Sequence, residues 1–129
     1  MRLSLDTNIY SAFKNGNEKI RDILENTDEI LISVTVLGEL YSGFQIGSLT
    51  EKNLKELDDF LLKPGVLVVE INKETALRYG FLTKKLRKQG TPIPTNDIWI
   101  AASTMETGSI LLSRDKHFKV IPGLMVLDF

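Results

Sequence analysis

The chain has 129 residues, of which 43% are hydrophobic and 26% are charged, and its formal net charge is −1 at pH 7. This length and composition are typical of one globular domain with a hydrophobic core. No apolar stretch approaches the length of a membrane span, and the first residues lack the apolar centre of a signal peptide. The absence of cysteine excludes disulfides, thiolate zinc sites and cysteine nucleophiles, and favours a reducing compartment such as the cytoplasm. The near-neutral charge lacks the global signature of a nucleic-acid-binding protein, so such binding would need a local basic patch.

The N-terminal part of the chain alternates strand and helix patterns. The segment "LSL" at 3–5 predicts a short apolar strand, which Asp6 ends. Helices are expected over 8–14 and 17–24. The apolar run "ILISV" at 30–34 predicts a buried strand.

Two helices and a strand are expected in the middle of the chain. The helix over 35–47 is expected to begin with Thr35 as its N-cap. A second helix over 50–63 carries leucines on one face. The segment "VLVVEI" at 66–71, rich in β-branched residues, predicts a second buried strand.

The C-terminal part adds two helices and two strands. A long amphipathic helix is expected over 72–90, and the helix over 96–108 is nearly apolar all round, which predicts that it is buried. Strands are expected over 109–113 and 124–128. Short apolar strands alternating with helices favour a parallel sheet covered on both faces. The fold class is therefore α/β, with residues 1–129 forming a single domain.

Four acidic residues fall where such a sheet would gather them. Asp6 directly follows the first strand, and Asp115 lies two residues after "ILLS". Ligands of open parallel sheets bind outside the carboxyl ends of the strands, so both acids are expected at that edge. Asp97 begins an apolar helix, and Glu39 lies on a largely apolar helix face, where an unpaired carboxylate is costly to bury. Taken singly, each has a structural interpretation, as a cap, a turn residue or a partly exposed glutamate.

Converging carboxylates repel one another unless a cation binds between them. Because the chain has no cysteine and a single histidine, the ligands available are mostly oxygen atoms. Oxygen ligands favour Mg²⁺ or Mn²⁺ over zinc. A competing hypothesis is a binding module whose acids are only caps, and it predicts no response to divalent metals.

Four segments resemble the PIN-domain family and, within it, the VapC-type toxins of bacterial and archaeal toxin–antitoxin pairs. They are "LSLDTNIYSA", "SVTVLGELYSG", "PTNDIWIAAS" and "LLSRDKHFKVIPGLMVLDF", in the family's order over essentially the whole chain. The resemblance implies a three-layer α/β/α sandwich with a central parallel sheet. It also implies a Mg²⁺- or Mn²⁺-dependent endoribonuclease that acts as a toxin.

The resemblance further implies roles for individual residues. The catalytic acids would be Asp6, Glu39, Asp97 and Asp115. Of these, Asp6, Asp97 and Asp115 would bind the metal directly or through water, while Glu39 would be a further ligand or orient the attacking water. Two asparagines would orient the carboxylates by hydrogen bonds, and a serine would lie near the metal-bound water. These supporting residues are Asn8, Asn96 and Ser113.

Basic residues near the end of the 72–90 helix and around Asp115 are candidates for RNA binding. They are Lys84, Arg87, Lys88, Arg114 and Lys116. In the functional interpretation these residues bind the phosphate backbone of RNA. In the competing interpretation they form a solvated helix end that the helix dipole favours. His117 is expected to be a surface or packing residue, and Trp99 a core residue.

The resemblance implies three partners: an RNA substrate, a small antitoxin that docks beside the active site, and a second copy in a homodimer. No membrane partner is expected. One alternative is a PIN-domain nuclease that serves RNA processing, which the absence of an antitoxin gene upstream would favour. Another is a phosphoaspartate receiver domain, which is also doubly wound but expects paired acids after the first strand.

Overall fold

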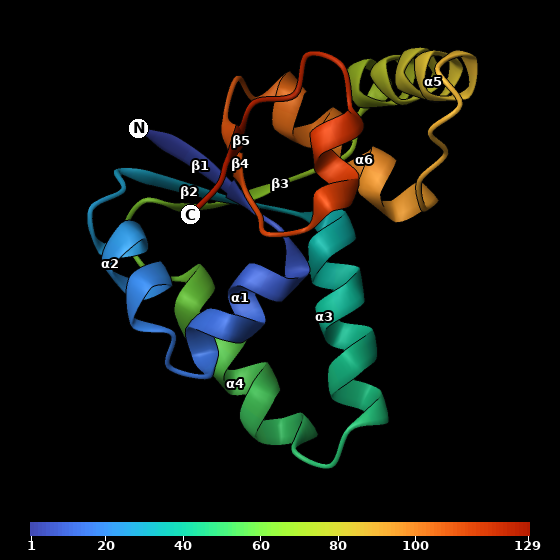
Figure 1. Ribbon diagram of the computed structural model, residues 1–129. Coiled ribbons are helices and arrows are strands. Elements are labelled where there is room, and N and C mark those ends of the chain that lie inside the picture. The colour runs from blue at the N-terminus through green and yellow to red at the C-terminus, as the bar shows by residue number, and fades with distance from the viewer.

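A parallel sheet of five short strands, in the order β3-β2-β1-β4-β5, forms the centre of the protein (Figure 1). The computed structural model describes residues 1–129. The strands are β1 (Arg2–Leu5), β2 (Glu29–Ser33), β3 (Val66–Val69), β4 (Ile110–Leu112) and β5 (Val126–Leu127). This order differs from the 2-1-3-4-5 order of receiver domains, so the receiver alternative is wrong.

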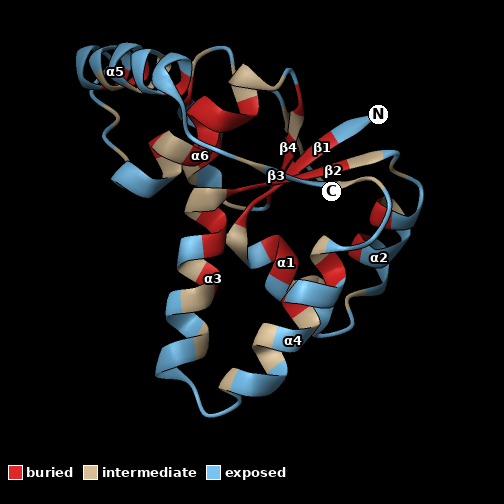
Figure 2. Ribbon diagram, turned by 180° about the vertical axis from the view of Figure 1, so that it is seen from behind, coloured by how far each residue is buried: buried red, intermediate tan, exposed pale blue.

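Six α-helices and one 3₁₀ helix surround the sheet. They are α1 (Thr7–Lys14), α2 (Glu18–Glu25), α3 (Val34–Ile46), α4 (Thr50–Leu61), α5 (Lys73–Lys88), α6 (Thr95–Glu106) and η1 (Lys116–Val120). Helices α1, α2 and α4 lie on one side of the sheet, and α5 and α6 on the other (Figures 1 and 2). Helix α3 leaves the carboxyl edge of the sheet and contacts α1, α4 and α6. The predicted α/β/α sandwich is confirmed. None of the helices combines the length and hydropathy needed to cross a membrane.

The inner strands bury their side chains, and the edge strand β3 does not (Figure 2). Leu3, Leu5 and Leu111 are at most 1% exposed, because helices cover both faces of the inner strands. The prediction of a second buried strand at 66–71 was wrong, since Leu67 is 49% exposed and β3 pairs only with β2. Its β-branched composition indicates a strand but does not determine its place in the sheet.

Two details of the helices differ from the predictions. Ser33, not Thr35, is the N-cap of α3, and its hydroxyl accepts a hydrogen bond from the backbone N–H of Val36 at 3.3 Å. Helix α6 is buried along much of its length as predicted, but Trp99 is only half-buried. Its ring stacks on that of Tyr79 with centroids 4.0 Å apart. Trp99 therefore joins α6 to α5 at the margin of the core.

The sheet brings the ends of β1 and β4 together. These strands are parallel neighbours, with Leu5 in register with Leu112. After β1 the chain builds β2 and β3 on one side, and it later returns to place β4 and β5 on the other. The carboxyl ends of β1 and β4 therefore lie at the point where the strand order reverses, which is where such sheets bind ligands.

Candidate active site

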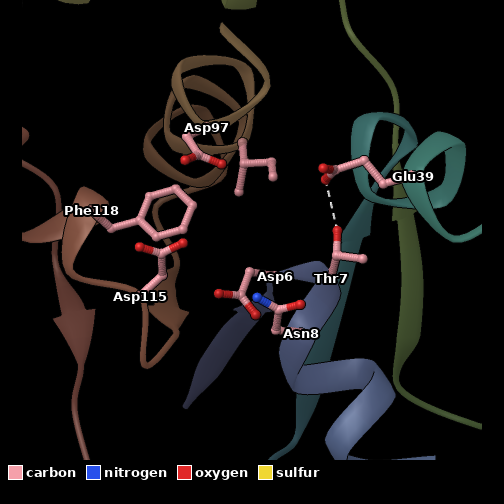
Figure 3. Close-up of a pocket in the computed structure, with 8 residues that line it drawn as sticks. Asp6, Thr7, Asn8, Glu39, Asp97, Asp115 and Phe118 are labelled. Carbon is pink, nitrogen blue, oxygen red and sulfur yellow. Dashed lines mark hydrogen bonds between the residues drawn. The ribbon is translucent and has the colours of Figure 1, made fainter. Parts of the chain in front are cut away.

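The four predicted acids face one hollow at this point of the sheet (Figure 3). The hollow has a volume of about 160 Å³. The residues that line it are Asp6, Thr7, Asn8, Glu39, Asp97, Ile100, Asp115 and Phe118. The acids come from four different elements, so only the tertiary fold brings them together.

Asp6 lies deepest of the four and is 4% exposed. It follows β1 and is also the N-cap of α1, because its Oδ1 accepts a hydrogen bond from the N–H of Ile9 at 2.8 Å. Its Oδ2 accepts a hydrogen bond from the hydroxyl of Ser113, the residue after β4. Burial raises the pKa of Asp6, these two hydrogen bonds offset part of the rise, and the charges of Asp115 and Asp97 add to it.

Asp97 lies in the first turn of α6 and does not cap the helix. Its Oδ2 is 3.0 Å from Nδ1 of His117, the one hydrogen bond that its carboxylate makes. Burial raises the pKa of Asp97, and the negative charges of Asp115 and Glu39 add to the rise, while His117 opposes it. A carboxylate whose ionisation is disfavoured by its neighbours gains from a bound cation.

Asp115 joins the end of β4 to η1. Its Oδ1 accepts a hydrogen bond from the N–H of His117 at 2.9 Å, which makes it the N-cap of η1. Its own N–H donates to the hydroxyl of Ser113 at 3.0 Å. Ser113 is fully buried and so links two of the acids, donating to Asp6 and accepting from the backbone of Asp115.

Glu39 faces the hollow from the opposite side, on α3 (Figure 3). The hydroxyl of Thr7 donates to its Oε1 at 2.7 Å. The side chain is half-buried, so this carboxylate is neither fully paired nor fully solvated. Thr7 connects Glu39 to the start of α1, directly after Asp6.

Besides Ser113, the supporting hydrogen bonds come from residues that the sequence did not indicate. Asn8 lines the hollow, and Asn96 lies beside Glu39 in an adjoining groove, but neither donates a hydrogen bond to a carboxylate. Thr7 and His117 do so instead. His117, which was expected to be a surface or packing residue, is partly exposed and is also part of the acid site. The one signal that could have found it is its place two residues after Asp115.

The donor set suits a divalent metal ion. Asp97, Asp115 and His117 each offer one ligand atom, and these atoms lie within 4.8 Å of one another. The second oxygen of Asp97, of Asp115 and of Glu39 makes no hydrogen bond within the protein. These free oxygens and Asp6 form a mostly oxygen set, which fits a hard cation.

The predicted RNA-binding residues lie in two groups. Lys84, Arg87 and Lys88 are exposed on the last turns of α5, where none has a carboxylate within ion-pair distance. The residue after this helix, Gln89, donates from Nε2 to the carbonyl of Val120 in η1 at 2.7 Å, so the basic turn lies against the end of η1. The second group, Arg114 and Lys116, flanks Asp115, and the guanidinium of Arg114 lies over the ring of Phe129.

Comparison with known proteins places this chain in a family. The PIN domain family model matches residues 3–124. The chain is 30% identical to ribonuclease VapC1 of Haemophilus influenzae strain R2866, with 97% of the chain and 96% of the relative covered. It is 29% identical to the tRNA(fMet)-specific endonuclease VapC of Salmonella typhimurium, with 100% and 98% covered. The fold matches the crystal structure of VapBC2 from Rickettsia felis bound to a promoter DNA fragment, with a TM-score of 0.88, 29% identity and 98% of each chain covered. The chain thus belongs to the PIN-domain family and, within it, to the VapC ribonucleases.

Proposed function

We propose that this chain is the toxin of a toxin–antitoxin pair and hydrolyses RNA phosphodiester bonds with the help of Mg²⁺ or Mn²⁺. The observation that carries the proposal is the convergence of Asp6, Glu39, Asp97 and Asp115 on one hollow at the reversal of strand order. Residues 1–129 would act as one nuclease domain in the cytoplasm.

The four acids would have two different roles. Asp6, Asp97 and Asp115 would hold the ion, directly or through water. A divalent cation supplies three things for this reaction: a water of lowered pKa, a clamp on the phosphate, and charge stabilisation at the leaving oxygen. Glu39, held by Thr7 across the hollow, would orient the attacking water or accept its proton.

The unpaired cations near η1 support a path for the RNA backbone. Lys84, Arg87 and Lys88 at the end of α5 and Arg114 and Lys116 beside Asp115 would neutralise phosphates. Because such contacts release counterions, binding should weaken steeply with salt, although the whole chain has a net charge of −1. The supporting residues Asn8 and Asn96 lie at the rim, where they would contact water or substrate.

The solved relatives support a protein partner. The Rickettsia felis structure is of VapBC2 bound to promoter DNA, and a small antitoxin would by our proposal dock beside the acid hollow of this chain and inhibit it. A homodimer remains part of the proposal, with the oligomeric state in solution as its test.

The first experiment measures RNA cleavage by the purified chain. One relative is named for tRNA(fMet), so initiator tRNA is the first substrate and an elongator tRNA is its control. Cleavage should require Mg²⁺ or Mn²⁺, stop in EDTA, and fall by ~100-fold or more in Asp97→Asn, because even outer-sphere partners of metal ligands are worth about 10–100-fold. Asp58→Asn makes the same change at an exposed residue of α4 and is the matched control.

Two outcomes would contradict the proposal. Cleavage that persists in EDTA or in Asp97→Asn would remove the acids from the mechanism. Induced expression that leaves a bacterial host growing normally, while the purified chain cleaves RNA, would favour the RNA-processing alternative over the toxin.

A further inference from the structure

His117 donates hydrogen bonds to two of the site acids. Its backbone N–H donates to Oδ1 of Asp115 at 2.9 Å. Its ring Nδ1 lies 3.0 Å from Oδ2 of Asp97 and 3.4 Å from Oδ1 of Asp115. Because an ionised carboxylate oxygen can only accept, Nδ1 forms a hydrogen bond to it when Nδ1 carries the proton.

The two acids that His117 joins lie on different segments, and no other residue hydrogen-bonds to both carboxylates. Asp97 lies on α6, and Asp115 follows β4. The carboxylate of Asp97 makes no other hydrogen bond, so the imidazole alone orients it. The next residue, Phe118, is 2% exposed and anchors η1 in the core, which holds the backbone of His117 in place.

The same contacts leave the opposite oxygens free. Oδ1 of Asp97 and Oδ2 of Asp115 have no donor in the protein. A ring nitrogen that carries a proton cannot bind a metal, but it can hold a carboxylate that does. This arrangement is typical of an outer partner of a metal site.

We propose that His117 is a positioning residue of the acid site, which through its Nδ1–H holds Asp97 and Asp115 ready for a divalent cation. This inference rests on the proposed function, because it presumes that the acids bind a metal. The rival is direct ligation of the ion by Nδ1, the ring nitrogen that faces both acids, which would require a lone pair on Nδ1 and the proton on Nε2.

Three substitutions of His117 distinguish the positioning role from direct ligation, because they differ in whether and where the new side chain offers an N–H donor. The side-chain amide of asparagine can occupy the position of Nδ1, that of glutamine reaches toward the position of Nε2, and alanine supplies no donor. We expect isothermal titration with Mn²⁺ to give a dissociation constant within ~threefold of wild type for His117→Asn. The value should rise by about 10-fold or more for His117→Ala and His117→Gln. The side chain is 44% exposed, so all three variants should fold, and thermal melting in EDTA checks this.

The result that would overturn the proposal is equally specific. Asparagine binding as weakly as alanine would mean that the ring itself ligates the ion, and equal affinities in all four proteins would remove His117 from the site. Wild type that binds no Mn²⁺, or binds it no better than Asp97→Asn, would overturn the acid metal site as well. Binding that depends on Asp97 and ignores His117 would overturn this inference alone.

A second measurement needs no metal. Because the chain has a single histidine, the ring signals of ¹⁵N-labelled histidine belong to His117 without further assignment. In metal-free protein with a neutral ring, we expect the proton on Nδ1. A proton on Nε2 would contradict the proposal, because Nδ1 would then have no hydrogen to donate to Asp97.

Discussion

Replacing Asp97 by asparagine should stabilise the metal-free protein. The carboxylate is 16% exposed, and one of its oxygens lies within 4.8 Å of a ligand oxygen of Asp115. At that separation two unit charges repel by about 3.5 kcal/mol at an effective dielectric constant of ~20, and by ~0.9 kcal/mol at that of water. Because His117 compensates part of this repulsion, we expect asparagine to raise the free energy of unfolding by about 1–2 kcal/mol. Asparagine keeps an oxygen that accepts from Nδ1, so this hydrogen bond survives.

Thermal melting in EDTA, with and without added Mn²⁺, measures both halves of the argument. The metal-free variant should melt higher than wild type by ~3 °C or more. Mn²⁺ at ten times its dissociation constant should then raise the stability of wild type by about 1.4 kcal/mol, and that of the variant by much less. The melting temperatures of the two proteins should therefore converge, or reverse their order, as the metal is added.

The control for this prediction is Asp58→Asn on α4, an exposed acid without an ion pair, which should change stability by less than ~0.5 kcal/mol. An Asp97→Asn protein that melts below wild type in EDTA would refute the reasoning. It would mean that the carboxylate stabilises the fold and does not strain it. Equal responses of both proteins to Mn²⁺ would refute the metal half alone.

Three further predictions concern the same site and one turn. Burial and neighbouring charges raise the pKa values of Asp6 and Asp97, so the metal-free native state binds protons more tightly than the unfolded chain. Its free energy of unfolding should therefore fall as pH rises from about 3.8 through the raised pKa values. Urea unfolding at a series of pH values measures this, and the dependence on pH should be weaker when both acids are replaced by asparagine. Ser113→Ala should cost about 1–3 kcal/mol, because it leaves a buried carboxylate oxygen and a backbone N–H without partners; an unchanged urea midpoint would contradict this. Gly65→Ala should lower the melting temperature, since φ is +84° and a Cβ would lie 2.4 Å from the carbonyl oxygen of Asp28, and unaltered melting would show that the turn can relax.

The structural and functional interpretations of the acids are compatible. Asp6 and Asp115, whose structural interpretation was that of turn residues after strands, both cap helices and both also face the hollow. A carboxylate that caps a helix accepts the backbone hydrogen bond with one oxygen, so its other oxygen can bind a group in the hollow. Asp97 differs, because it lies in the first turn without capping, so no hydrogen bond to the backbone of α6 uses its carboxylate. Of the acids near helix starts, Asp97 is therefore the sharpest test of the site.

The sequence alone determined the elements and the edge at which the acids meet. Short apolar runs alternating with helical patterns favour a parallel sheet, and residues directly after such strands lie at one edge because parallel strands end there together. Asp6 and Asp115 could be placed in this way from local order. Glu39 and Asp97 had weaker local signals, a carboxylate on an apolar helix face and an acid at a helix start, since no local rule indicates which side of a helix faces a distant strand.

Tertiary structure decided everything that depends on neighbours distant in sequence. The exposure of β3 follows from its place at the edge of the sheet, which the composition of a strand does not determine. Thr7 and His117, rather than Asn8 and Asn96, orient the carboxylates, because hydrogen bonds depend on distances and angles that only packing determines. The proximity of the basic end of α5 to η1 likewise depends on the contact from Gln89 to Val120, 31 residues apart in the chain. Periodicity and strand ends are local properties of a chain, whereas partners across a fold are fixed only when the core is packed.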